Sequence, residues 1–175
     1  MSNESLRFYL CLSPCSSEWY VDINVIDSVS SPGVPFKTTL RVRDCCLCLH
    51  LQRAARAQAR RFDDALRPLG LTNGQFSILM SLNRSEPAGM ASVASLLAMD
   101  RTTLTAALKP LERRKLIKIT TDRFDRRSRR LSLTAKGKAR LASALPIWEQ
   151  THREVESLLT DIDPDQLRRS LLALS

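Results

Sequence analysis

The most distinctive chemistry in this sequence lies in the guanidinium and ammonium groups between positions 101 and 140. That stretch holds fourteen Lys and Arg residues against three Asp and Glu residues, a formal charge of +11, whereas the whole chain of 175 residues carries +9. Basic groups at this density create a local field that attracts a polyanion. The alternative is a solvated basic surface with no partner, because charge alone does not specify what is bound.

Two sets of side chains in this stretch have the chemistry to contact nucleic acid. The first set follows Asp100, which is expected to cap a helix, and comprises Arg101, Thr102, Thr103, Thr105 and Lys109. An Arg fork can bind guanine in the major groove, and a Thr methyl group can contact the methyl group of thymine. The same threonines could instead serve only as capping and surface residues.

The second set lies in the charged segment 122–130 and comprises Arg123, Arg126, Arg127, Arg129 and Arg130. Permanently charged, planar groups suit phosphates and narrow minor grooves. We expect Asp122 and Asp125, in the same segment, to brace it by pairing with Arg, because a carboxylate that faced phosphates would be repelled.

Cysteine is the other reactive side chain, at positions 11, 15, 45, 46 and 48. The cluster at 45–48 allows three interpretations. The first is simple packing, since free Cys is often a core residue. The second is a redox-sensitive thiol at Cys48, near a helix start and Arg53. The third is a metal site with His50, but only Cys45 and Cys48 of the three thiols share a helix face. We therefore predict neither a metal nor a cofactor.

Several classes of protein are excluded by what the sequence contains. Hydrophobic residues make up 43% and charged residues 26%, which is typical of a folded globular protein. There is no run of about 18 apolar residues, and the start of the chain does not resemble an export signal. A cytoplasmic protein with no membrane partner and reduced thiols is expected. No glycine-rich phosphate loop, His-Glu motif or plausible carboxylate pair occurs, so an enzyme is not predicted.

The elements that must position these groups are mostly helical. Thr72, Asp100, Thr134 and Asp163 are expected as N-caps, and Gln75 completes a capping box with Thr72. The predicted order is helices at 45–69, 73–83, 91–97 and 101–115, strands at 116–121 and 129–133, and helices at 135–160 and 164–174. Two short helices joined by a tight turn, followed by a basic hairpin, predict a mainly α fold with a small β-hairpin wing, a winged helix-turn-helix.

The chain divides into an arm and one domain. Residues 1–44 are interpreted as an N-terminal arm outside the core, either ordered, disordered or preceding the true start of the protein. Residues 45–175 form the domain, with the winged helix-turn-helix at 70–135 and flanking helices at 45–69 and 136–175. The apolar faces of the flanking helices are too wide for so small a core to cover, which predicts a homodimer that buries them.

Four segments together carry a family resemblance. They are LGLT at 69–72, QFSIL at 75–79, VASLLAMDRTTLTAALKPLERRKLI at 93–117 and DRFDRRSRRLSLTAKG at 122–137, and they resemble the MarR family of bacterial winged-helix regulators. The resemblance covers residues 46–174. It implies a dimer that binds a palindromic operator in double-stranded DNA and is released by a small ligand or an oxidant. The family wing pattern resembles Asp-x-Arg-Asp-x-Arg, but Phe124 stands in place of the first Arg, and Arg123 or Arg126 could substitute.

The resemblance also implies two regulatory sites. A pocket for a small-molecule inducer is expected between the helix-turn-helix and the dimer helices, with Phe62, Asn73 and Phe76 as its lining. Cys48 resembles in position the reactive cysteine of the organic-hydroperoxide-sensing branch, although Phe62 and Asn73 stand where that branch typically has tyrosines.

The sequence therefore predicts a sequence-specific transcriptional regulator, in the first instance a dimeric repressor. One alternative is a thiol-based peroxide sensor of the same family that acts through Cys48. Another is an architectural protein that binds DNA without sequence preference, which a sharp palindromic footprint would exclude.

Overall fold

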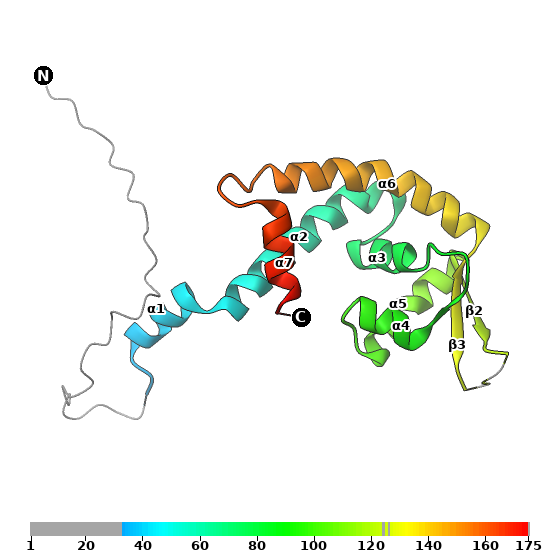
Figure 1. Cartoon of the computed structure of the whole chain (residues 1–175), viewed down its shortest axis with the longest axis horizontal. Helices are drawn as coiled ribbons and strands as arrows, with labels where there is room; N and C mark the ends of the chain where they lie inside the picture. Colours follow the sequence, from blue (N-terminus) through cyan, green and yellow to red (C-terminus); the bar gives the residue numbers. More distant parts are fainter. Residues whose placement is uncertain (1–32, 124, 126, 175) are drawn as a thin grey trace, which may run out of the picture. The chain divides into compact units, whose positions relative to one another are not determined.

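The structure is a computed structural model that describes residues 33–123, 125 and 127–174 (Figure 1). The predictions for residues 1–32, Phe124 and Arg126 lie outside the described residues. The elements, in chain order, are α1 (Phe36–Cys45), α2 (Leu47–Leu66), the 3-10 helix η1 (Arg67–Leu69), α3 (Asn73–Ser81), β1 (Ala88–Gly89), α4 (Met90–Leu96), α5 (Arg101–Arg113), β2 (Ile117–Thr121), β3 (Arg129–Leu133), α6 (Ala135–Glu156) and α7 (Pro164–Leu172).

The chain folds as two units whose boundary falls inside α2, between Ala54 and Ala55. The described part of the first unit holds α1 and the start of α2. Helix α1 was not predicted, and it buries none of its residues. The single helix predicted at 45–69 is interrupted at Cys46, whose extended backbone separates α1 from α2. At its other end α2 gives way to η1, where Pro68 and the left-handed Gly70 (φ 64°) prevent further α-helix.

The four predicted N-caps are confirmed in the second unit. The Thr72 hydroxyl accepts from the Gln75 amide N–H at 3.2 Å, and the Gln75 side chain accepts from the Thr72 N–H at 3.4 Å. The side chains of Asp100, Thr134 and Asp163 likewise accept from backbone N–H groups at the starts of α5, α6 and α7. Each cap satisfies donors that a helix start would otherwise leave without partners.

The sheet has three antiparallel strands in the order β1-β3-β2. Strands β2 and β3 form the predicted hairpin wing, with Ile117 opposite Leu133 and Thr121 opposite Arg129. Strand β1 was predicted as part of a loop. It pairs Ala88 with Leu131 and Gly89 with Arg130, which attaches the segment that precedes α4 to the wing.

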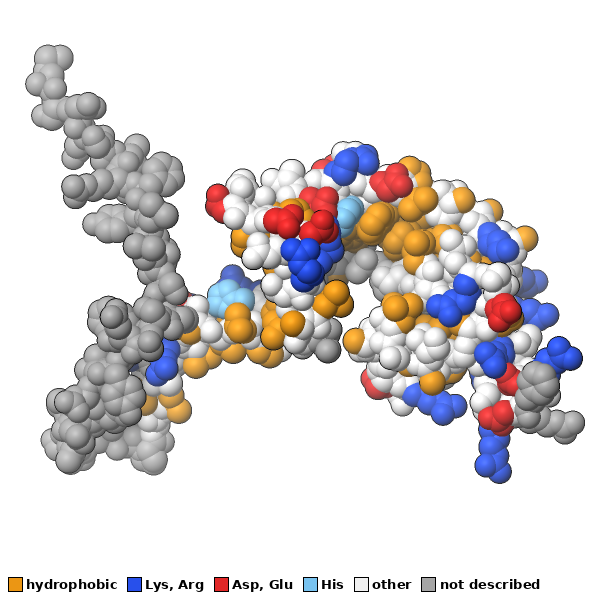
Figure 2. Space-filling model, in the orientation of Figure 1, with side chains coloured by type: hydrophobic (Ala, Val, Ile, Leu, Met, Phe, Trp, Pro, Cys, Tyr) orange, Lys and Arg blue, Asp and Glu red, His pale blue; other side chains and the backbone are white. Residues whose placement is uncertain are grey.

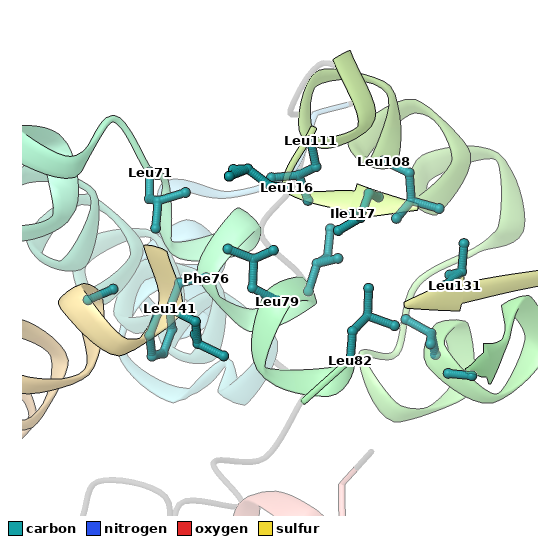
Figure 3. Packing of buried hydrophobic residues seen from close by; sticks show 14 of the residues in the cluster. Leu71, Phe76, Leu79, Leu82, Leu108, Leu111, Leu116, Ile117, Leu131 and Leu141 are labelled. Atoms are coloured by element: carbon teal, nitrogen blue, oxygen red, sulfur yellow. The ribbon is translucent and has the colours of Figure 1, made fainter. Parts of the chain in front are cut away.

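The core of the second unit is a layer of buried leucines beneath α5 and the wing. Helix α3 lies between α6 on one side and α4 and α5 on the other (Figure 1). Figure 3 shows the side chains that α3, α5, the wing and α6 contribute. Leu79, Leu104, Leu111 and Leu131 are all fully buried. Burial of this apolar surface holds α5 with its opposite face in solvent.

One glycine sets how closely the wing and α6 approach. A side chain on Gly137 would place its Cβ 1.9 Å from the Leu116 carbonyl oxygen, so only glycine fits at this position. The Thr134 N–H donates to the same carbonyl oxygen at 3.1 Å. The first turn of α6 is therefore packed directly against the base of the wing.

The C-terminal end of the second unit leaves apolar side chains in solvent. Helix α7 buries none of its residues, and Leu158, Leu171, Leu172 and Leu174 are exposed. None of the helices in the described part of the chain is long and apolar enough to cross a membrane.

Candidate nucleic-acid interface

Helix α5 follows α4 after a tight turn in which Ala98 has a left-handed backbone (φ 49°). Asp100 then caps α5. Its carboxylate accepts from the Thr103 N–H at 2.8 Å and from the Thr103 hydroxyl at 2.5 Å. These two hydrogen bonds, the hydroxyl first, hold the pKa of Asp100 below its ordinary value. A charged carboxylate at this point also complements the positive end of the helix dipole.

The predicted contact residues of α5 all lie on its solvent face. Leu104, Leu108 and Leu111 are buried on the opposite face. The five predicted residues, Arg101, Thr102, Thr103, Thr105 and Lys109, are all exposed. Helix α5 continues through Pro110 to Arg113, although a proline there removes one backbone hydrogen bond.

The threonines on this face differ in what their hydroxyls can do. Thr103 donates to Asp100, and Thr105 donates to the Arg101 carbonyl oxygen at 2.7 Å. Their hydroxyl hydrogens are therefore used inside the helix, and what they offer outward is a methyl group and an acceptor oxygen. The side chains of Arg101, Thr102 and Lys109 have no hydrogen bond or ion pair within the described residues.

The wing is held in shape by its two acidic residues. Asp122 is 6% exposed and forms an ion pair with Arg130, as predicted. It also accepts from the Asp125 N–H at 3.1 Å. Asp125 was expected to pair with Arg as well, but its carboxylate accepts from the Arg127 N–H at 2.9 Å and the Ser128 hydroxyl at 2.7 Å. The Ser128 hydroxyl and then the Arg127 amide lower the pKa of Asp125.

The wing arginines present their charge from this braced loop. Arg123, Arg127 and Arg129 are exposed. The Arg129 guanidinium donates to the Thr121 hydroxyl at 2.7 Å, across the two strands. Figure 2 shows Lys and Arg side chains gathered over the part of the molecule that carries the wing, with acidic side chains between them.

A groove of about 940 Å³ lies between the wing, α4 and the start of α5. Arg101 and Arg129, which were predicted to contact nucleic acid, both line this groove. Arg84, which follows α3, was not predicted, because an isolated arginine at the end of a predicted helix belongs to no pattern. The other polar residues that line it are Glu86, Ser92, Asp122, Asp125, Ser128 and Arg130.

A second, apolar cavity of about 430 Å³ lies among α3, α4 and α6. It is lined by Phe76, Ser77, Met80, Ser81, Leu96, Leu97 and Trp148. Phe76 and Trp148 stack with ring centroids 6.1 Å apart. Of the three residues predicted for an inducer pocket, Phe76 lines this cavity, whereas Phe62 and Asn73 are not part of its lining.

The described cysteines, Cys45, Cys46 and Cys48, lie at the junction of α1 and α2. Cys48 is exposed, and the Gln52 amide donates to its Sγ at 3.2 Å. Cys45 and Cys46 are half-buried. His50 bonds the Cys46 carbonyl oxygen through Nδ1 at 2.9 Å. Within residues 33–123, 125 and 127–174, no three metal-ligating side chains converge on one point.

Comparison with known proteins identifies the class to which this arrangement belongs. The sequence model of the MarR family matches residues 71–128. The Mycobacterium tuberculosis transcriptional regulator MosR, solved in complex with DNA, is 37% identical with a TM-score of 0.67, over 74% of this chain and 92% of MosR. The transcriptional repressor CouR, bound to a 23-mer DNA duplex, is 30% identical with a TM-score of 0.60, over 81% of this chain and 95% of CouR.

Curated relatives agree with this result over a shorter span. The HTH-type transcriptional regulator SarZ of Staphylococcus epidermidis is 28% identical over 92 residues, which is 53% of this chain and 62% of SarZ. The chain belongs to the MarR family of winged helix-turn-helix transcriptional regulators. It is therefore placed among regulators and not among enzymes.

Proposed function

We propose that this chain is a homodimeric, sequence-specific DNA-binding repressor. The observation that carries the proposal is the exposed face of α5, where Arg101, Thr102 and Lys109 point away from a buried leucine face, beside an arginine-bearing wing. In this proposal α5 enters the major groove and the wing contacts the adjacent backbone and minor groove. The two charge sets then serve different purposes, since base contacts specify a sequence and phosphate contacts position the protein.

Exposed apolar side chains support the homodimer. Leu158 and Leu171 are exposed at the C-terminal end, and apolar side chains that gather at one end of a protein are often covered by a partner. We assign dimerisation to the helices at 45–69 and 136–175. A two-fold dimer would place two copies of α5 about one turn of DNA apart. Light scattering on the wild type should give twice the chain mass, and Leu171→Asp should shift it toward the monomer.

Release of DNA by a small ligand is supported by the cavity among α3, α4 and α6. Its lining is mostly apolar, and the stacked rings of Phe76 and Trp148 form part of its wall. A ligand there would contact α6 and the start of the helix-turn-helix together. It could therefore bias the position of one relative to the other.

The second candidate is a peroxide sensor that acts through Cys48. Its support is the exposure of that thiol and its contact with Gln52. An exposed thiol is accessible to a peroxide, which converts a thiolate to a sulfenic acid.

The test is a fluorescence-anisotropy titration on the DNA upstream of the protein's own gene, against scrambled DNA at equal salt. It is run on reduced protein, after mild organic hydroperoxide, and with Cys48→Ser. The repressor proposal expects tight binding to one sequence only. Loss of that binding on oxidation, with retention in Cys48→Ser, would establish the thiol switch.

The other outcomes are equally informative. If oxidant does not change specific binding, the inducers would be small ligands. The cysteines would then be packing residues. Equal binding to scrambled DNA would contradict the repressor proposal on this DNA and favour an architectural protein.

A further inference from the structure

We propose that the groove between the wing and α4 holds one sugar–phosphate strand of bound DNA, and that Arg84 is a phosphate-contacting residue within it. This inference rests on the proposed DNA-binding function. It assigns a binding role to the segment between α3 and β1, which lies outside both α5 and the wing.

The position of the groove follows from the two elements on either side of it. Arg101, at the start of α5, and Arg129, on β3 of the wing, both line it. The major and minor grooves of DNA are separated by a single sugar–phosphate strand. A protein that puts a helix in one groove and a hairpin on the other must straddle that strand. The space between α5 and the wing is where the strand would run.

Arg84 is oriented into this groove before any DNA arrives. Its Nε donates to the Ser81 carbonyl oxygen at 3.1 Å. Ser81 is itself buried at the end of α3, and Ile78, Leu79 and Leu82 anchor that helix in the core. One side of the guanidinium is therefore fixed. Its terminal nitrogens have no hydrogen bond or ion pair within the described residues, which leaves them available as donors.

The charges in the groove favour a phosphate despite the acidic residues there. Asp122 is buried and paired with Arg130, so it contributes little negative charge to the surface. Asp125 accepts from the Ser128 hydroxyl and the Arg127 amide but keeps its charge, so Asp125 and Glu86 remain as exposed acids. Against these two acids stand three exposed arginines, Arg84, Arg101 and Arg129.

The salt dependence of DNA binding tests this role directly. A phosphate contact releases about one counterion, so each contact adds about 0.9 to the slope of log K against log salt. In the proposed homodimer Arg84 occurs twice, and Arg84→Ala and Arg84→Gln should each lower the slope by about 2. At low salt both variants should bind roughly tenfold or more weakly. The ratio of affinities for specific and scrambled DNA should stay within roughly 2-fold of wild type, because phosphate contacts carry no sequence information.

The experiment uses a duplex that the wild-type protein selects from random-sequence DNA, titrated between about 50 and 200 mM salt. Arg84→Lys should keep most of the slope, since it keeps the charge. Arg41→Ala is the matched control. Arg41 lies on α1 and is exposed like Arg84, but it belongs neither to the proposed DNA-binding surfaces nor to the helices assigned to dimerisation. The Arg41→Ala variant should bind as the wild type does.

Each outcome separates this inference from the proposed function. An unchanged slope in Arg84→Gln, with tight wild-type binding, would overturn the groove proposal and leave DNA binding intact. A lost specificity ratio with an unchanged slope would make Arg84 a base contact and overturn it as well. Failure of the wild type to select or bind any duplex would overturn the proposed function itself. Thermal unfolding of each variant identifies any that fails to fold, and Arg84→Gln then stands in for Arg84→Ala.

Discussion

Helix α5 and the wing, the two surfaces proposed to contact DNA, are held in place by different chemistry. Helix α5 is held by apolar packing, with Leu104, Leu108 and Leu111 buried beneath it. The wing buries Ile117 and Leu131 in the same core, but its tip is held by Asp122 and Asp125 and its base by the close contact at Gly137. Apolar packing does not depend on charge, whereas a hydrogen bond or ion pair is lost when one partner is removed. A mutation should therefore be able to weaken the wing without disturbing α5, or the reverse.

The largest effect is expected at the base of the wing, from Gly137→Ala. The new Cβ would overlap the Leu116 carbonyl, a backbone atom that cannot move aside without shifting β2. We expect a loss of about 3 kcal/mol or more in the free energy of unfolding, measured by urea denaturation.

Gly74→Ala is the matched control for that variant. A Cβ on Gly74, in α3, would meet nothing within 4 Å, and alanine favours a helix over glycine. This variant should be as stable as the wild type or more stable by about 0.5–1 kcal/mol. Equal destabilisation by both substitutions would show that the contact at Leu116 is not what limits position 137.

The second-largest loss of stability is expected at the tip of the wing, from Asp122→Ala. The change removes a buried partner of Arg130 and an acceptor for the Asp125 N–H. Because Arg130 is itself about half exposed, we expect a loss of about 2 kcal/mol in the free energy of unfolding, less than for a fully buried pair. DNA affinity should fall while base preference on the α5 side is kept. A loss of base preference equal to that of an α5 variant would contradict the separation of the two surfaces.

A smaller effect on binding alone is expected from Arg101→Ala. The Arg101 side chain has no hydrogen bond or ion pair within the described residues, so its removal should leave the free energy of unfolding unchanged. If it reads a base, specificity should relax at one position of each half-site by about 1.5 kcal/mol, roughly tenfold. Competition between duplexes that differ at single base pairs measures this. Uniform weakening across all duplexes would instead make Arg101 a phosphate contact.

How far the sequence predicts these features depends on whether the cause is local. The caps at Thr72 and Asp100 were predicted because a capping residue and its N–H partners lie within three positions of each other. The bounds of β3, Arg129–Leu133, were predicted from the alternation of apolar Leu131 and Leu133 with polar Arg130 and Ser132. Strand β1 was missed because two residues cannot show an alternating pattern, and its pairing with Leu131 is a tertiary contact.

In the candidate site, too, the features with local causes were predicted and those that depend on tertiary contacts were not. The exposure of the five residues named on α5 was predicted, since helical periodicity alone places Arg101 and Leu104 on different faces. The role argued for Arg84 depends on a groove formed with the wing, more than forty positions further along the chain. The cavity lining was predicted only at Phe76, because Leu96 and Trp148 come from separate helices and meet only in the folded protein.

The smallest effect on stability is expected from low pH. It should act on both α5 and the wing, because each has an Asp with a lowered pKa. The pKa values of Asp100 and Asp125 are lowered by hydroxyl and backbone N–H donors. A carboxyl group with a lowered pKa in the folded state binds fewer protons there than in the unfolded chain. Its contribution to stability is therefore complete above the ordinary Asp pKa of about 3.9 and is lost as the pH falls through the lowered value.

Asp100→Asn and Asp125→Asn test this contribution by removing the charge while keeping one of the two acceptor oxygens that each carboxylate uses. Each variant loses one hydrogen bond and should be somewhat less stable than the wild type near neutral pH. Between about pH 5 and pH 3 the wild type should lose more stability than either variant, and the double variant should lose least. Urea denaturation across this range measures the difference. Parallel loss of stability in all four proteins would assign acid sensitivity to other carboxylates, and would leave apolar packing as the main support of α5.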